Sequence, residues 1–145
     1  MAPTLAETTV SVRLTLADRE VGGLFRECTG LDSETEVTEQ KAIDERGGTV
    51  IRKVPGQTKW SNITLRRGID QDTGLWEWRD QVQRKGADAA RTDGTIELLD
   101  YEGSPIATYR FAQGWPVRYG VDVRASNNEL AIETIEIAVE RVERV

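Results

Sequence analysis

The chain has 145 residues, of which 38% are hydrophobic and 30% are charged, and its formal net charge is −6 at pH 7. This length predicts a single domain, residues 1–145, with a hydrophobic core, and no apolar run approaches the roughly 18 residues of a membrane-spanning helix. Histidine is absent and cysteine occurs once, at Cys28, which excludes histidine-based catalysis, a Cys/His zinc site and an internal disulfide. The acidic balance argues against a general nucleic-acid-binding surface, which would be basic.

The first predicted strand covers Thr8–Ala17. Apolar residues occupy every second position from Val10 to Leu16, and polar residues occupy the positions between them. Such alternation is typical of a strand with one buried face. A short second strand is predicted near Leu24–Thr29.

Leu31–Thr38 is predicted as a strand without an apolar face. Asp32, Glu34 and Glu36 share one side, and the other side is only weakly apolar. Two interpretations remain open: a solvated outer strand or loop, or a strand that lines a water-filled lumen or a polar subunit interface. Residues 40–48 are predicted to form a polar, protruding loop.

A basic segment follows, from Thr49 to Gly68. It is predicted to contain two strands, Thr49–Val54 and Ser61–Arg67, joined by a short loop at Pro55-Gly56. The segment has five basic residues and no acidic one, whereas Asp32–Arg46 has six acidic residues against two basic ones. Opposite charges on separate patches favour head-to-tail contact between copies, which closes into rings or continues as filaments.

One helix is predicted, from about Asp72 to Lys85. Asp72 or Thr73 has a side chain that can cap the first turn, and Gly86 is suited to ending the helix. Leu75, Trp78 and Val82 recur at helical spacing. Core packing against a sheet is the simplest explanation for both Trp76 and Trp78.

Strands are also predicted for the remainder of the chain. In the last one the apolar positions change parity between Ile132 and Ile135, which predicts a β-bulge near Glu133 or Thr134. The expected fold is mainly β, an antiparallel barrel or sandwich of about eight to nine strands with one packed helix. The four strands expected here are Thr95–Leu99, Ile106–Phe111, Trp115–Val123 and Glu129–Val142.

No pattern in the chain predicts catalysis, a metal site or a cofactor. The spacing of Asp32, Glu34 and Glu36 matches one face of a strand and not a calcium-binding loop. Cys28 is expected to be a small buried residue and not a reactive thiol. We therefore predict no catalytic residue, no metal ligand, no cofactor and no enzymatic activity.

Several short segments, taken in order, resemble one protein family. The similarity runs from about Val10 to Glu140, and the chain resembles the tail-tube (inner tube) proteins of contractile-tailed phages and phage-tail-like contractile injection systems. The segments that carry it are Gly30–Glu36, Arg52–Lys59, Asn62–Gly68, Leu75–Trp78, Gly114–Val117 and Asn128–Thr134.

The resemblance implies a structural protein that performs no chemistry. It implies hexameric rings stacked into a rigid hollow tube, inside a contractile sheath and on baseplate or hub proteins. The subunit would be made in the bacterial cytoplasm without a membrane anchor and would become part of an injection particle or phage tail. The tube would deliver cargo or DNA through a target envelope, without binding either specifically.

The charge pattern and the resemblance together suggest which residues serve the tube. Asp32, Glu34 and Glu36 are predicted to face the lumen, where carboxylates would repel DNA or an acidic cargo. Contacts between stacked subunits are predicted for the protruding loop and the basic segment. These candidates are Glu39, Lys41, Ile43, Arg46, Arg52, Lys53, Lys59 and Arg66.

Other functional classes remain to be weighed against the tube. A monomeric β-barrel that binds a small ligand predicts an apolar cavity and a monomer in solution. An enzyme with a carboxylate-only site is a weaker alternative. The ring-forming protein of the type VI secretion system is a close structural relative, but the segments above favour the tail-tube family.

Overall fold

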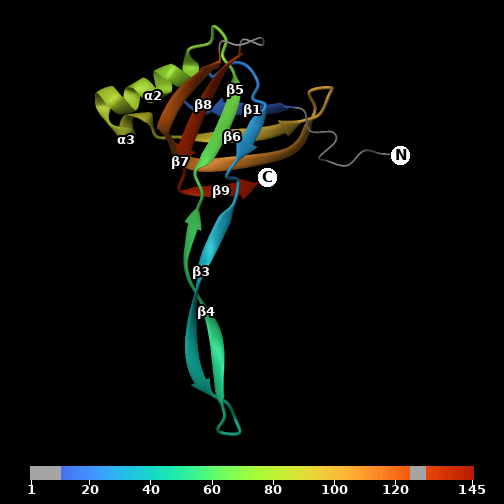
Figure 1. Cartoon of the computed structure of the whole chain (residues 1–145), viewed down its shortest axis with the longest axis vertical. Helices are drawn as coiled ribbons and strands as arrows, with labels where there is room; N and C mark the ends of the chain where they lie inside the picture. The colour runs from blue at the N-terminus through green and yellow to red at the C-terminus, as the bar shows by residue number, and fades with distance from the viewer. Residues whose placement is uncertain (1–10, 125–129) are drawn as a thin grey trace.

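The computed structural model describes residues 11–124 and 130–145, and within them it is mainly β (Figure 1). Nine strands and two helices are present in these ranges, which confirms the predicted fold class and adds one short helix. The strands are β1 Ser11–Leu16, β2 Glu27–Thr29, β3 Ser33–Ile43, β4 Thr49–Trp60, β5 Ile63–Gly68, β6 Thr92–Leu99, β7 Pro105–Arg124, β8 Leu130–Ala138 and β9 Arg141–Arg144; the helices are α2 Gly74–Lys85 and α3 Ala87–Ala90. Neither helix has the length and apolar character needed to span a bilayer.

The body of the molecule is an antiparallel sheet that curls around one core. Its strand order is β1-β6-β7-β8-β5-β2, and β9 pairs with β7. The long strand β7 belongs to both halves: its first part pairs with β6 and β9, and its second part pairs with β8. A bridge between Val12 and Phe25 brings β1 to the start of β2. The sheet is thereby almost closed into a barrel.

Strand β7 continues where the sequence predicted two strands, Ile106–Phe111 and Trp115–Val123. A register shift lies opposite Asp93, and Gln113 adopts a positive φ of 54° there. The Asp93 Oδ1 atom accepts a hydrogen bond from the Gln113 N–H at 3.0 Å. A bulge of this kind bends a strand without ending it. Gly94 and Gly114 are required beside this bend, because a Cβ atom at either position would lie 2.3 Å from the Phe111 ring.

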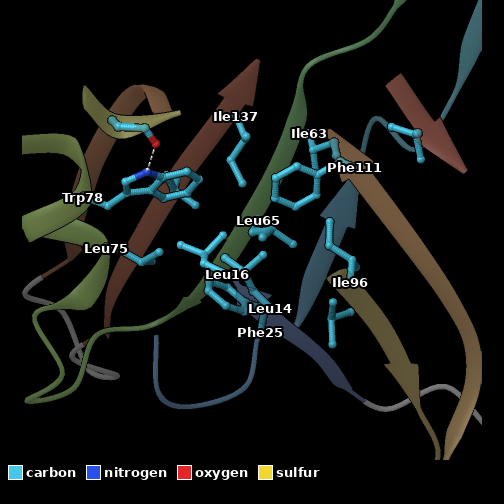
Figure 2. Close-up of a cluster of buried hydrophobic side chains, with 14 residues drawn as sticks. Leu14, Leu16, Phe25, Ile63, Leu65, Leu75, Trp78, Ile96, Phe111 and Ile137 are labelled. Atoms are coloured by element: carbon cyan, nitrogen blue, oxygen red, sulfur yellow. Dashed lines mark hydrogen bonds between the residues drawn. The ribbon is translucent and has the colours of Figure 1, made fainter. Parts of the chain in front are cut away.

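The helices cover one side of the sheet and supply part of the core (Figure 2). Leu75 and Trp78 of α2 pack beside strand residues such as Leu65 and Ile137, and all four are fully buried. The Trp78 Nε1–H donates to the Ala90 carbonyl at 2.7 Å, so the helix that the sequence missed, α3, is tied to α2. Trp76, in contrast, is 48% exposed, and the prediction that it packs in the core is wrong.

Strand β8 has no bulge near Glu133 or Thr134, so that prediction is also wrong. Its register to both β5 and β7 is continuous across these residues. Glu133 itself lies on the core side, opposite Arg67 of β5, and both side chains are buried. The parity of the apolar residues changes because a buried ion pair occupies this core position, while Leu130 and Ile132 lie on the other side of the sheet.

Strands β3 and β4 form a long hairpin that extends away from the body (Figure 1). Strand β3 continues to Ile43, where the sequence predicted a loop from Gln40, because pairing with β4 satisfies its backbone without an apolar face. Pro55-Gly56 does not end β4 either. The register shift between Thr35 and Val37 places a bulge there, and bulges tolerate proline.

The tip of the hairpin is a turn over Asp44–Gly48. The Asp44 Oδ1 atom accepts hydrogen bonds from the backbone N–H groups of Arg46 and Gly48, at 2.9 and 2.7 Å. Gly47 has a positive φ of 80°, a conformation that favours glycine. The turn is therefore held locally, without support from the body.

Candidate assembly surfaces

The hairpin carries apolar side chains that nothing in the described chain covers. Ile43 is 78% exposed and Ile51 is 62% exposed, and Val37 is equally open. These three lie on one face of the hairpin, because Lys41 opposes Ile51 and alternate residues of a strand share a face. A two-stranded hairpin is marginally stable by itself. Burial of this face against another molecule would stabilise it.

The acidic and basic segments turn out to be partners in the same hairpin. Glu34 opposes Lys59 and Glu39 opposes Lys53 in the register. Lys59 Nζ also lies 3.0 Å from Glu36 Oε1, and both side chains are more than half exposed. Exposed pairs of this type contribute at most about 1 kcal/mol. The charge segregation in the sequence therefore has an explanation within one chain, and head-to-tail contact is not needed to account for it.

The structure gathers all but one of the predicted contact residues on the hairpin. Glu39, Lys41 and Ile43 lie on β3, and Arg46 lies in the turn. Strand β4 holds Arg52, Lys53 and Lys59. Arg66 lies apart from them, on β5, beside Glu27.

The predicted lumen-facing carboxylates lie at the base of the hairpin. Glu34 and Glu36 are exposed residues of β3. Asp32 precedes that strand, and its carbonyl accepts a hydrogen bond from the Ser61 N–H at 3.2 Å. Whether these carboxylates face a lumen stays a prediction.

A second surface, which the sequence did not indicate, is the outer face of β7-β8-β5-β2. We call it the open face: the residues of these strands that point away from the core. Most of its side chains are exposed or half-buried, with Thr134 the buried exception. It carries three arginines and three carboxylates, so its charge is balanced. These are Arg66, Arg118, Arg124, Glu27, Asp122 and Glu136, placed on one face by the register.

Apart from the Val12–Phe25 bridge just before β2, the same four strands end in two edges that have no strand partner within residues 11–124 and 130–145. Strand β2 pairs only with β5, and the second part of β7 pairs only with β8. Free edges present unpaired N–H and C=O groups, which template pairing with another chain. The two edges lie at opposite ends of this four-stranded sheet, one on β2 and one on β7, so they are different surfaces.

A buried polar cluster fixes the end of this sheet. Arg67 Nε donates to Glu133 Oε1 at 2.8 Å, and the Tyr119 hydroxyl donates to Glu133 Oε2 at 2.5 Å. Burial and the adjacent Glu133 carboxylate raise the pKa of Tyr119 above its ordinary value. Arg67 also donates to the Gly22 carbonyl and lies over the Phe25 ring at 4.9 Å. The broken apolar parity of β8 was the only sequence signal of this cluster.

The main hollows among the described residues are open to the surface. One, of about 460 Å³, lies between β1 and the loop after it, and its lining mixes arginines and carboxylates with leucines. The centre of the body is filled with side chains instead (Figure 2). No group of three or more metal-ligating side chains lies together in the described part of the chain. Cys28 packs against the core, and burial raises its thiol pKa to about 11.

Comparison with known proteins places the chain in a family. A family model for the T4-like virus tail tube protein gp19 matches residues 9–143. No curated protein sequence matches the chain.

Solved structures give the same result. The chain is 25% identical to a chain of the sheath-tube complex of an extracellular contractile injection system, PVC, in its extended state; the match covers 94% of this chain and 88% of that one, with a TM-score of 0.73. A chain of the anti-feeding prophage cap is 26% identical, with 92% and 87% covered and a TM-score of 0.71. Hcp1 from Flavobacterium johnsoniae shares the fold at 17% identity, with 92% and 94% covered and a TM-score of 0.57.

The family match spans nearly the whole chain, and the fold agrees with it. The family model describes a tail tube protein, and two of the solved relatives are chains of a sheath-tube complex and of a tube-terminating cap. The chain belongs to the family of T4-like virus tail tube proteins, and its role is that of a structural tube subunit.

Proposed function

We propose that this subunit forms hexameric rings that stack into the hollow inner tube of a contractile injection particle or phage tail. The observation that carries the proposal is the pair of free edges on β7-β8-β5-β2. Pairing β2 of one copy with β7 of the next is a head-to-tail contact, and such contacts generate rings when the rotation closes. Closure leaves no exposed edge. The family resemblance supplies the expectation of six copies.

The hairpin would connect one ring to the next. It extends from the body along the longest axis of the molecule (Figure 1), and its exposed apolar face is centred on Ile43 and Ile51. We place the predicted stacking contacts here, through Glu39, Lys41, Arg46, Arg52 and Lys53. Arg66 contributes to the open face instead.

Closing the four strands into a ring would turn the open face toward the lumen. The helices pack on the core side of the sheet, so α2 would face outward, where a sheath surrounds the tube. The solved relative in a sheath-tube complex supports the sheath as a partner, and the family resemblance supports baseplate proteins. Asp32, Glu34 and Glu36 would face the channel at the junction between rings.

The experiment is negative-stain microscopy of the purified chain, with sedimentation velocity, at low and high salt. Rings or tubes are expected. If salt weakens them, exposed charges contribute to stacking; if it does not, the apolar face of the hairpin dominates.

If the purified subunit stays monomeric, a second measurement tests whether it assembles when a nucleus is present. Sheath and baseplate proteins from the same particle are added as a nucleus, and incorporation into tubes is followed by microscopy. A chain that remains monomeric even then would overturn the proposal and favour a monomeric binding module.

A further inference from the structure

A notch indents the open face where β5 ends and β8 begins. Its volume is about 220 Å³. A cavity of about 150 Å³ holds benzene, so the notch has room for one aromatic or branched apolar side chain. We call it the Leu130 notch; its lining is Arg26, Glu27, Arg66, Arg67, Gly68, Leu130 and Ile132.

The floor of the notch is apolar and open to solvent. Leu130 is 46% exposed, and Ile132 is half-buried beside it. Gly68 lies directly opposite Ile132 in the register. A Cβ atom added at Gly68 would meet no atom within 4 Å, and its φ is not positive. Neither crowding nor backbone conformation requires glycine here, and its missing side chain keeps the floor accessible.

The rim of the notch is basic. Its lining has two exposed arginines, Arg26 and Arg66, and one exposed carboxylate, Glu27. The Arg66–Glu27 contact is long, at 4.0 Å between exposed side chains. A second hollow, of about 260 Å³, shares Glu27 and Arg66 and continues past Thr29 and Thr64. Both hollows therefore lie beside β2 and β5 and share part of their rim. A ligand that fits the notch would have an apolar side chain flanked by carboxylates, because guanidinium groups pair well with carboxylates.

We propose that the Leu130 notch binds an acidic polypeptide segment through one apolar anchor residue. The inference rests on the proposed ring, in which the open face lines the lumen and the occupant is a polypeptide inside the tube. One notch offers little buried area, so each contact is weak. Repetition around the ring and along the tube raises the overall avidity by multivalency. The notches would then hold an acidic cargo chain between the ring junctions, where Asp32, Glu34 and Glu36 are predicted to repel it.

The test is fluorescence anisotropy with a fluorescein-labelled pentapeptide, Glu-Asp-Leu-Asp-Glu, added to the purified chain as monomer or as assembled tubes. Two peptides serve as controls, one with lysine at the four acidic positions and one with serine in place of leucine. Binding of the first peptide at least tenfold tighter than both controls is expected. Equal binding of the three peptides, or no binding, would overturn the proposal.

Variants then locate the binding. Gly68→Val fills the notch and suits a strand, so affinity is expected to fall at least tenfold, whereas Thr95→Val on β6 leaves it unchanged. Leu130→Asn is a second variant that removes the apolar floor, should Gly68→Val fold poorly. Unchanged affinity in both notch variants would refute the site.

Sedimentation of the same variants separates this inference from the proposed ring. Rings that persist without peptide binding overturn the notch and leave the ring intact. If Gly68→Val abolishes rings, the notch is a contact between copies and the cargo assignment is wrong.

Discussion

The body and the hairpin of this subunit are stabilised in different ways. The body buries an apolar core that includes Leu14, Phe25, Trp78 and Ile135. Nearly every residue of β3 and β4 is exposed, and their mutual pairing is their main contact in the chain. The body is thus expected to be stable in the free subunit, whereas the hairpin depends on what covers it. In a self-assembling protein, an ordered element without a core marks a surface that a second copy can bury.

The largest expected effect comes from Trp78. Trp78→Ala removes a fully buried side chain and its hydrogen bond to Ala90, and it should lower the free energy of unfolding by about 3–5 kcal/mol. Trp76→Ala, two residues away on the same helix, removes a half-exposed ring that packs edge-on against Tyr119, and it should cost about 1 kcal/mol. Urea denaturation followed by circular dichroism measures both. Equal losses would contradict the assignment of only one tryptophan to the core.

The buried ion pair ranks next. Glu133→Leu leaves the buried Arg67 without its main partner, which should cost about 3 kcal/mol or more. The double variant Arg67→Met/Glu133→Leu removes both charges and should recover most of the loss, because matched apolar replacements are often neutral. The same denaturation experiment compares the single and double variants. A double variant as unstable as the single one would show that the pair itself stabilises the body.

Alkaline pH should destabilise the body through Cys28. Burial raises the pKa of this thiol to about 11, so the folded state holds the proton more tightly than the unfolded state, whose thiol pKa is about 8.5. The stabilisation is complete below about pH 8.5 and is lost as pH rises through 11. Between pH 8 and pH 10.5 the chain should lose about 2 kcal/mol more than Cys28→Ala. Identical pH profiles of the two proteins in urea denaturation would contradict this prediction.

The smallest effect on the free subunit is expected in the hairpin. Ile43→Ser changes an exposed tip residue, so the free energy of unfolding should shift by no more than about 0.5 kcal/mol. Assembly is the sharper measurement: tubes should be shorter or absent in electron micrographs, while single rings persist. Val145→Ser, at an exposed position of the body (67% against 78% for Ile43), is the control. Full-length tubes from Ile43→Ser would remove the hairpin tip from the stacking contact.

The sequence predicted those elements in which one face is buried in the usual way. The alternation around Val12, Leu14 and Leu16 corresponds to β1, and the helical spacing of Leu75 and Trp78 corresponds to α2. Patterns failed where burial was unusual. The buried ion pair of Arg67 and Glu133 changes the parity of the apolar residues in β8, a pattern that predicted a bulge. A real bulge at Gln113 interrupts the alternation in β7, a pattern that predicted the end of a strand.

The sequence by itself determined the β-rich class, the single long helix, the lack of histidine chemistry and the resemblance to tail-tube proteins. These follow from local periodicity, composition and ordered segments, all of which are read along one chain. Only the tertiary structure decided that the acidic and basic segments pair with each other, that four strands share an open face, and that Gly68 lies beside Leu130 and Ile132. Register and face depend on which strands pair over long sequence distances, and the core, not the local sequence, selects that pairing.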